Sequence, residues 1–278
     1  MSLNGSANGP SGANGNGQAV GSNLAFTKFL FVMPQRLDDA SAARLRSVGS
    51  LIGRGFFNEY DIEGGSAPFE TIQFLVHEGE PPPATGDDSG WLARARYVVQ
   101  VSSKYRPRLN EVEEELRRRL GDFADVRALE GALRNPRYSS AEMQHYISRG
   151  GACRRSGRVS RNAIILPVRK HRDWWQQSTL ERHTYFYPHV DKASGCPVKG
   201  HATAAEAGIP LVFRRLYHNP DGYEREGEFD FVTYFECTDE GLPVFDAICK
   251  ALRDPLQNPE WRYVEEGPMW RGRRVLRW

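Results

Sequence analysis

The second half of the chain alternates strand and helix patterns in a fixed order. Short apolar runs and strict alternation predict strands, and apolar positions three and four residues apart predict helices. The predicted elements are a strand at 164–168 (IILPV), a helix from about 173 to 189, strands at 211–218 (LVFRRLYH) and 229–237 (FDFVTYFEC), a helix at 241–254, and a last strand at 261–272 with a Gly-Pro break. The order is therefore β-α-β-β-α-β. The polar stretch 191–210 predicts a loop with one short helical turn.

The first half gives a looser version of the same order. Its predicted elements are a strand at 24–34, a helix from Asp38 or Asp39 to about Leu51, strands at 69–79 and 91–106, and a helix at 110–120, followed by a less readable stretch with a helix at 139–150. Two such units in tandem predict an α+β fold of two ferredoxin-like halves. Each half has an antiparallel sheet with helices on one face, which leaves the other face for a partner or a ligand.

The domain boundaries follow from these patterns. Residues 24–150 form the predicted N-terminal half and residues 151–278 the predicted C-terminal half. Residues 1–23 are rich in Gly, Asn and Ser and lack apolar side chains to bury, so we expect a disordered tail. No clean sequence repeat relates the halves, so the duplication is inferred from element order alone.

Composition narrows the functional class. The 278 residues have a net charge of +2 and 40% apolar side chains, without the basic stripe typical of nucleic-acid binding. No apolar run approaches the roughly 20 residues of a membrane span, and the N-terminus lacks the features of a secretory signal. We therefore expect a cytoplasmic globular protein that binds neither nucleic acid nor membrane.

The cysteines do not form a recognisable framework. Four are scattered without a C-x-x-C pair, at Cys153, Cys196, Cys237 and Cys249. This pattern favours free thiols over disulfides. Zinc binding by Cys196 with His201, or by His183 with His189, is a weaker alternative because neither spacing matches a compact zinc module.

His189 is the most suggestive histidine of the chain. It follows the aromatic residues Tyr185, Phe186 and Tyr187, and Pro188 directly before it tends to kink or end a helix. An imidazole placed there could reach a metal or a planar cofactor. A structural role is the simpler alternative.

The strand at 211–218 carries two consecutive arginines. Alternation places Arg214 and Arg215 on opposite faces, each between apolar neighbours. A buried arginine needs an acceptor, so either an internal salt bridge with an acid such as Glu236 or an anion site for a substrate is possible. Lys170 with Trp174 and Trp175 can similarly be core packing, or can line a flat aromatic ligand with acidic edges.

Together these pieces resemble the chlorite dismutase family of haem proteins, which includes the coprohaem decarboxylases. The matching strings are IILPVRKHRDWW, Glu181-Arg182 with His189 seven residues later, VFRRLYH, FVTYFE, RYVEEGPMWRG and, in the first half, WLARARYVVQVSSKYRPRLNEVEEEL. They cover most of residues 90–275. The resemblance implies tandem ferredoxin-like halves, haem b in the C-terminal half and a homo-oligomer, with a pentamer favoured.

The resemblance also implies roles for single residues. His189 matches the iron ligand and Arg214 the distal, catalytic arginine of the chlorite-degrading branch. The other matches are cofactor-binding residues around the haem, at Lys170, Trp174, Trp175, Tyr105, Thr233 and Phe235. The implied reaction converts chlorite to chloride and dioxygen by way of a ferryl intermediate and hypochlorite, with Arg214 keeping the hypochlorite anion close.

Three departures from the family pattern stand out. The connection from His189 to Arg214 is longer than expected by about a dozen residues. The glutamate expected beside the ligand histidine is replaced by Ala247, with Asp246 the nearest acid. Pro188 is unusual before the ligand. Alternatives of the same fold are a haem enzyme that oxidises a nitrogen-containing or organic substrate, and a haem carrier or sensor without turnover; a ligand-free fold with a structural His189 also stays open.

Overall fold

The computed structural model describes residues 25–36, 38–61, 70–80, 90–133 and 160–278. Outside these ranges lie the predicted tail at 1–23, the helix at 139–150, the thiol of Cys153 and the boundary between residues 150 and 151. Within them, no helix is both long and apolar enough to cross a membrane.

The first half follows the predicted order and adds a strand. Its elements are β1 (Ala25–Pro34), α1 (Asp39–Ile52), the short β2 (Phe57–Asn58), β3 (Thr71–His77), α2 (Trp91–Arg94), β4 (Tyr97–Ser103), α3 (Arg106–Leu120) and β5 (Ala124–Leu133). The predicted strand at 91–106 is wrong at its start, because the Leu, Ala and Arg of that segment favour the helical turn α2. β5 was not predicted.

The second half keeps the predicted order but divides its long elements. Its elements are β6 (Asn162–Lys170), α6 (Arg172–Gln176), α7 (Thr179–Thr184), β7 (His189–Val190), β8 (Pro197–Val198), α8 (Gly200–Ala205), β9 (Val212–His218), β10 (Phe231–Cys237), α9 (Leu242–Arg253), β11 (Val264–Glu266) and β12 (Trp270–Val275). The break at Gly267-Pro268 separates β11 from β12, and α8 is the short helical turn expected within 191–210.

The predicted helix that reaches His189 is wrong. Ser178 ends the first helical turn and caps a second helix through a capping box with Glu181. That helix stops at Thr184, and Pro188 cannot donate the backbone hydrogen bond needed to continue it. His189 lies instead in a two-stranded hairpin, where it pairs with Val198.

The main sheet of the described residues closes into a barrel. Its strand order is β10-β9-β5-β1-β4-β3-β12-β6, and β6 pairs back with β10. Each half contributes four antiparallel strands in the same relative order, β5-β1-β4-β3 and β12-β6-β10-β9. The halves join through β3 with β12, and through one pair between Ala132 of β5 and His218 of β9. This arrangement confirms the predicted tandem ferredoxin-like halves.

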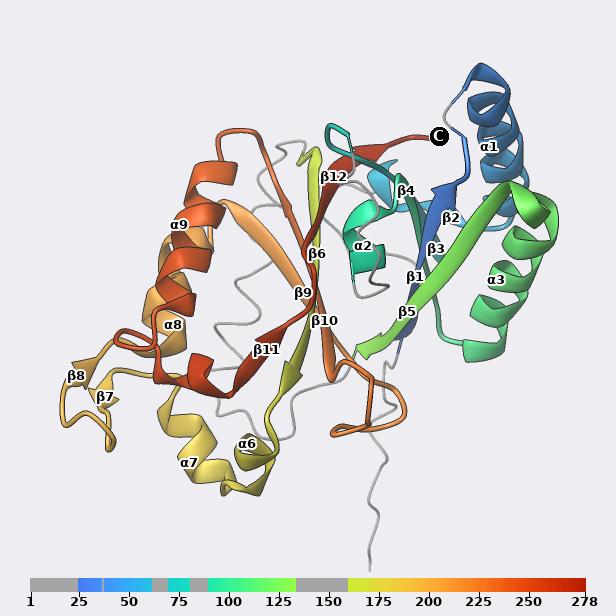
Figure 1. Cartoon of the computed structure of the whole chain (residues 1–278). Helices are drawn as coiled ribbons and strands as arrows, with labels where there is room; N and C mark the ends of the chain where they lie inside the picture. Colours follow the sequence, from blue (N-terminus) through green and yellow to red (C-terminus); the bar gives the residue numbers. More distant parts are fainter. Residues whose placement is uncertain (1–24, 37, 62–69, 81–89, 134–159) are drawn as a thin grey trace, which may run out of the picture.

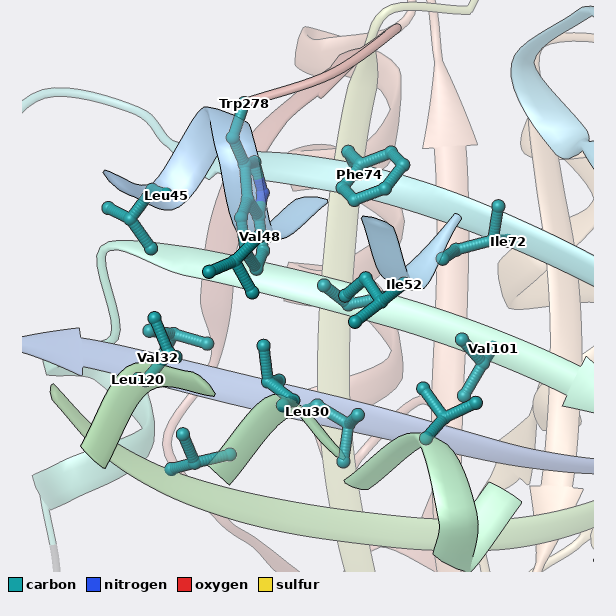
Figure 2. Close-up of a cluster of buried hydrophobic side chains, with 14 of the residues drawn as sticks. Leu30, Val32, Leu45, Val48, Ile52, Ile72, Phe74, Val101, Leu120 and Trp278 are labelled. Atoms are coloured by element: carbon teal, nitrogen blue, oxygen red, sulfur yellow. The ribbon is translucent and has the colours of Figure 1, made fainter. Parts of the chain in front are cut away.

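The central strands are apolar on both faces because both faces are covered. Leu30 and Val32 of β1 pack outward against α1 and α3, together with Phe74 and the C-terminal Trp278 (Figure 2). Phe29 and Phe31, one residue out of step, pack into the barrel interior, where the two halves meet. The inner, helix-free face of each half therefore packs on the other half, which is the partner alternative of the sequence prediction. The outer face is then the place to look for a ligand.

Helices cover only part of the outer face of the C-terminal sheet. Phe245 and Cys249 of α9 pack on Ile164, Val212 and Cys237 at one end of the strands. Figure 1 shows α8 beside α9, α6 and α7 near the opposite end of β6, and the β7–β8 hairpin at the outer edge. The middle of this face is where the predicted site residues gather.

Candidate functional site

An apolar platform lies on the outer face of the C-terminal sheet, and the strand register builds it row by row. Thr233 of β10 sits between Leu216 of β9 and Leu166 of β6, so these three side chains share one row. The next row holds Arg214, Phe235 and Ile164. Leu216 and Phe235 pack in one cluster with Leu166, although both stay partly exposed.

The two ends of the platform are closed by aromatic side chains. Phe235 meets Phe245 of α9 edge to face, with ring centroids 5.0 Å apart. At the other end Trp175 of α6 stacks on Tyr223 at 4.3 Å and lies over Phe231 of β10. A partly exposed apolar surface bounded by aromatic rings is suited to an apolar aromatic ligand.

The consecutive arginines of β9 have opposite environments. Arg215 points into the barrel, where its Nη1 lies 2.9 Å from Oε1 of Glu59 and also bonds the Tyr217 hydroxyl. Arg214 points to the platform and makes no hydrogen bond or ion pair with any described residue. Both readings of this strand are therefore realised, one by each arginine, and the acid that pairs with Arg215 is Glu59, while Glu236 pairs with Arg274.

Lys170 carries a buried ionic chain at the edge of the platform. Its Nζ lies 2.6 Å from Oε1 of Glu260, and Oε2 of Glu260 lies 3.1 Å from Nδ1 of His201 on α8. The ammonium also lies over the Trp174 ring, 4.1 Å from its centroid. The Glu260 carboxylate thus connects Lys170, on a strand of the platform, to His201 of the helix layer. This layer consists of α6, α7, α8, α9 and the β7–β8 hairpin, which lie on the outer side of the C-terminal sheet.

The neighbouring charges of Lys170, Glu260 and Arg214 shift the pKa values of Lys170 and Glu260. Burial lowers the pKa of Lys170 most and the charge of Arg214 lowers it further, while Glu260 opposes both. Burial alone would raise the pKa of Glu260, but the charge of Lys170 and the hydrogen bond with His201 outweigh it and hold that pKa below its usual range. Glu260 is therefore an ionised acceptor at neutral pH.

The His189 ring is held by a backbone carbonyl, whereas the His201 ring is held by the Glu260 carboxylate. The Nδ1 atom of His189 lies 2.8 Å from the Tyr187 carbonyl oxygen, which can only accept, so Nδ1 carries the proton. Its ring meets Tyr185 edge to face at 5.6 Å. Tyr185 in turn contacts Trp174 and Tyr263, which connects the hairpin to the Lys170 end of the platform through rings.

Trp175 contains a polar atom that needs explanation. Its indole Nε1 is buried and has no hydrogen-bond partner among the described groups. Most buried donors in proteins are paired, so an unpaired one at the rim of a site indicates a place for a ligand acceptor.

No family model matches the chain. Among solved structures it is similar to chlorite dismutase from Candidatus Nitrospira defluvii. The complex of that protein with imidazole is 18% identical with a TM-score of 0.62, over 92% of each chain. A mutant with lysine in place of an arginine is 17% identical with a TM-score of 0.63, over 90% of this chain and 91% of that one. A tryptophan mutant bound to cyanide gives 18% and 0.60, over 90% of each chain.

The chain has the chlorite dismutase fold. At these identities the likeness establishes architecture and leaves the activity to be argued from the site. The implied fold of the sequence resemblance is confirmed over nine-tenths of the chain.

Within this chlorite dismutase fold, most of the predicted site residues come together. Arg214, Thr233 and Phe235 share the platform, and Lys170, Trp174 and Trp175 line its edge. Tyr105 is not brought to them: it precedes α3 in the first half and is 71% exposed. Among the described residues, no hydrogen bond or ring contact connects the Tyr105 side chain to the platform.

The position predicted to replace the glutamate does not face the site. Ala247 is exposed on α9, and its neighbour Asp246 pairs with Arg271 at 2.6 Å. The carboxylate that meets a histidine is Glu260, which sequence reasoning missed. Glu260 stands two residues before the string RYVEEGPMWRG, but only the fold brings it to Lys170, 90 residues earlier.

The zinc alternatives gain no support. The described residues contain no group of three or more His, Cys, Asp and Glu side chains able to hold a metal ion. Cys196, Cys237 and Cys249 are free thiols, as predicted, and burial raises the pKa of Cys249 to about 11.

Proposed function

We propose that this protein is a haem-dependent oxidoreductase that acts on a small oxyanion, with chlorite as the first substrate to test. The cofactor would be haem b, bound on the platform between the C-terminal sheet and the helices that cover it. The observation that carries the proposal is that Arg214, on an apolar face within a chlorite dismutase fold, has no hydrogen-bond or ion-pair partner among the described residues.

Arg214 supports an anionic substrate. A guanidinium is always charged, and in a partly buried apolar setting it needs an acceptor. The neighbouring Arg215 pairs with the carboxylate of Glu59. Arg214 faces the platform and has no acceptor among the described residues. A small oxyanion would supply it through charge-assisted hydrogen bonds, which are stronger than neutral ones.

The residues present fit haem. Leu166, Leu216 and Phe235 offer a flat apolar surface for the macrocycle. The free N–H of Trp175 can donate to an acidic edge of the ring, and Lys170 adds positive charge nearby. The structures of similar fold include complexes with imidazole and cyanide, two small ligands of haem iron.

The helix layer would supply the iron ligand. Three histidines lie there, His183 on α7, His189 in the β7–β8 hairpin and His201 on α8. His189, the ligand expected from the sequence, stays a prediction.

When bound, haem would supply an iron centre able to exchange an oxygen atom with the substrate. The protein side chains would do the rest. Arg214 would bind the chlorite anion and then keep hypochlorite, the anion left when chlorite gives up one oxygen atom, in the site until the two oxygen atoms join as dioxygen and chloride leaves. Leu216, Thr233 and Phe235 would exclude water from the space beside it, which strengthens the charge of Arg214.

Oxygen evolution tests the reaction. Haem-loaded wild-type protein should release dioxygen when chlorite is added to an oxygen electrode cell. Arg214→Ala should bind haem with an unchanged Soret band but release oxygen at least tenfold more slowly, whereas Arg214→Lys should keep part of the rate because it keeps the charge. Arg169→Ala, which removes an exposed arginine paired with Glu265, is the matched control.

Two outcomes would redirect the proposal. Equal rates for Arg214→Ala and wild type would reject the anion role of Arg214. A normal haem spectrum without oxygen evolution would favour the alternatives: another oxidisable substrate, or a haem carrier or sensor. The pentamer and the cytoplasmic location also stay predictions, open to light scattering and cell fractionation.

A further inference from the structure

We propose that His201, rather than His189, is the axial ligand of the haem iron. This inference rests on the proposed function and assigns its ligand. Nothing in the sequence patterns singled out His201 except as a weak zinc partner of Cys196.

A ligand histidine needs one ring nitrogen anchored and the other free. Ligating histidines almost always donate the remote N–H to a carboxylate, a carbonyl or water, which fixes the ring and raises the basicity of the ligating nitrogen. A charged acceptor does this more strongly than a neutral one. His189 and His201 each have one anchored ring nitrogen, and the two anchors differ.

His201 has the charged anchor. Its Nδ1 lies 3.1 Å from Oε2 of Glu260, a carboxylate that can only accept. Nε2 therefore carries the lone pair, and no described group hydrogen-bonds to it. His189 also has Nδ1 anchored, but on the neutral carbonyl of Tyr187.

His201 is also held in place more firmly. Its ring stacks on Phe186 with centroids 5.8 Å apart and planes within 18°. The backbone N–H of His201 donates to the Tyr185 carbonyl at 3.0 Å, and α8 packs on α9. Gly200 fits this close approach, because a Cβ there would lie 2.4 Å from the Tyr187 carbonyl oxygen. A partly buried histidine held by ring stacking and by a backbone hydrogen bond suits a metal ligand, whereas His189 lies in a separate two-stranded hairpin.

The Lys170–Glu260 pair connects His201 directly to the platform. Lys170 is the last residue of β6 and lies on the same strand as Leu166, which forms the platform. The side chains of Lys170, Glu260 and His201 are 8%, 15% and 17% exposed, so the chain of contacts runs within the protein. His189 reaches the same region only through ring contacts of Tyr185.

The spectrum of the haem complex distinguishes the two ligands without any turnover. Ferrous protein should show an iron–histidine stretching band in resonance Raman spectra. We expect His201→Ala to lose this band and to regain it when imidazole is added, because imidazole can fill the space left by the side chain. His189→Ala should keep the band, and so should the control His171→Ala, which changes an exposed histidine.

A second variant covers the case in which His201→Ala fails to fold. Glu260→Gln keeps the shape of the anchor but removes its charge. It should shift the iron–histidine band to lower frequency and weaken haem binding by about 10- to 100-fold, as expected when the remote N–H of a ligand histidine loses its charged acceptor. An unshifted band in Glu260→Gln would overturn the inference, as would loss of the band in His189→Ala.

These outcomes separate the inference from the proposed function. A wild-type protein that binds no haem rejects both. A wild-type protein that binds haem and loses its histidine band only in His189→Ala rejects His201 and leaves the haem proposal intact.

Discussion

The two faces of β9 show how one strand divides structure from function. Arg215, on the inner face, bonds Glu59 and the Tyr217 hydroxyl within a barrel of paired polar groups. Arg214, one residue earlier, faces a platform where it has no described partner. The inner face is closely packed and specifies the fold. The outer face holds two donor groups without a hydrogen-bond partner among the described residues, the Arg214 guanidinium and the Trp175 indole N–H.

The largest difference between the faces should appear in stability. Arg215→Ala leaves the carboxylate of Glu59, 1% exposed, without its cation. Removing one partner of a buried ion pair costs about 3–5 kcal/mol. Arg214→Ala removes no described bond and should change the unfolding free energy by only about 0.5 kcal/mol. Urea denaturation of both variants checks this, and equal losses would erase the distinction between the faces.

A bulky side chain on the outer face should act on binding alone. Leu216→Trp places a large ring on the partly exposed platform, where it competes with a planar ligand. We expect haem affinity to fall at least tenfold while the urea midpoint stays close to that of wild type. Titration with haem followed by absorbance measures the first quantity. Undiminished haem affinity would place the ligand elsewhere.

The smallest effect concerns the β7–β8 hairpin. Hydrogen bonds from Arg262 lower the pKa of Asp191 to about 2 from the usual 3.8. The folded state thus holds the ionised form more tightly, so this contribution is complete above about pH 4 and is lost as the pH falls through about 2.

Asp191→Asn should remove that dependence. The stability gap between wild type and Asp191→Asn should be constant from pH 5 to 7 and should narrow toward pH 2, in thermal unfolding at matched salt. A gap that widens on acidification would contradict the role given to Asp191. Because the proposed ligand His201 lies on α8 and is anchored by Glu260, not by Asp191, the haem spectrum of this variant should match wild type.

The repeated order of elements was enough to predict the architecture. Period-two alternation in 211–218 and 229–237 gave both strands and the faces of Arg214 and Arg215 correctly. The strand β5 was missed because its sequence, ADVRALEGAL, mixes helix and strand formers, and the sheet that completes it is distant in sequence.

The segment that carries His189 and His201 was less predictable, because its contacts join residues that are far apart in the sequence. The aromatic run before His189 suggested one continuous helix, and the Ser178 capping box that divides it was overlooked. His201 lies twelve residues after His189, which matches the excess length of about a dozen residues noted between His189 and Arg214. The missing glutamate was sought on the helix after β10, whereas Glu260 follows that helix and reaches His201 through the fold.

Titration of the purified protein with haem b tests the central claim most directly. The platform, the unpaired Trp175 indole and the anchored histidines predict saturable binding of one haem per chain, with a sharp Soret band. Absorbance that rises without saturation, as for free haem, would contradict a haem site on the outer face of the C-terminal sheet.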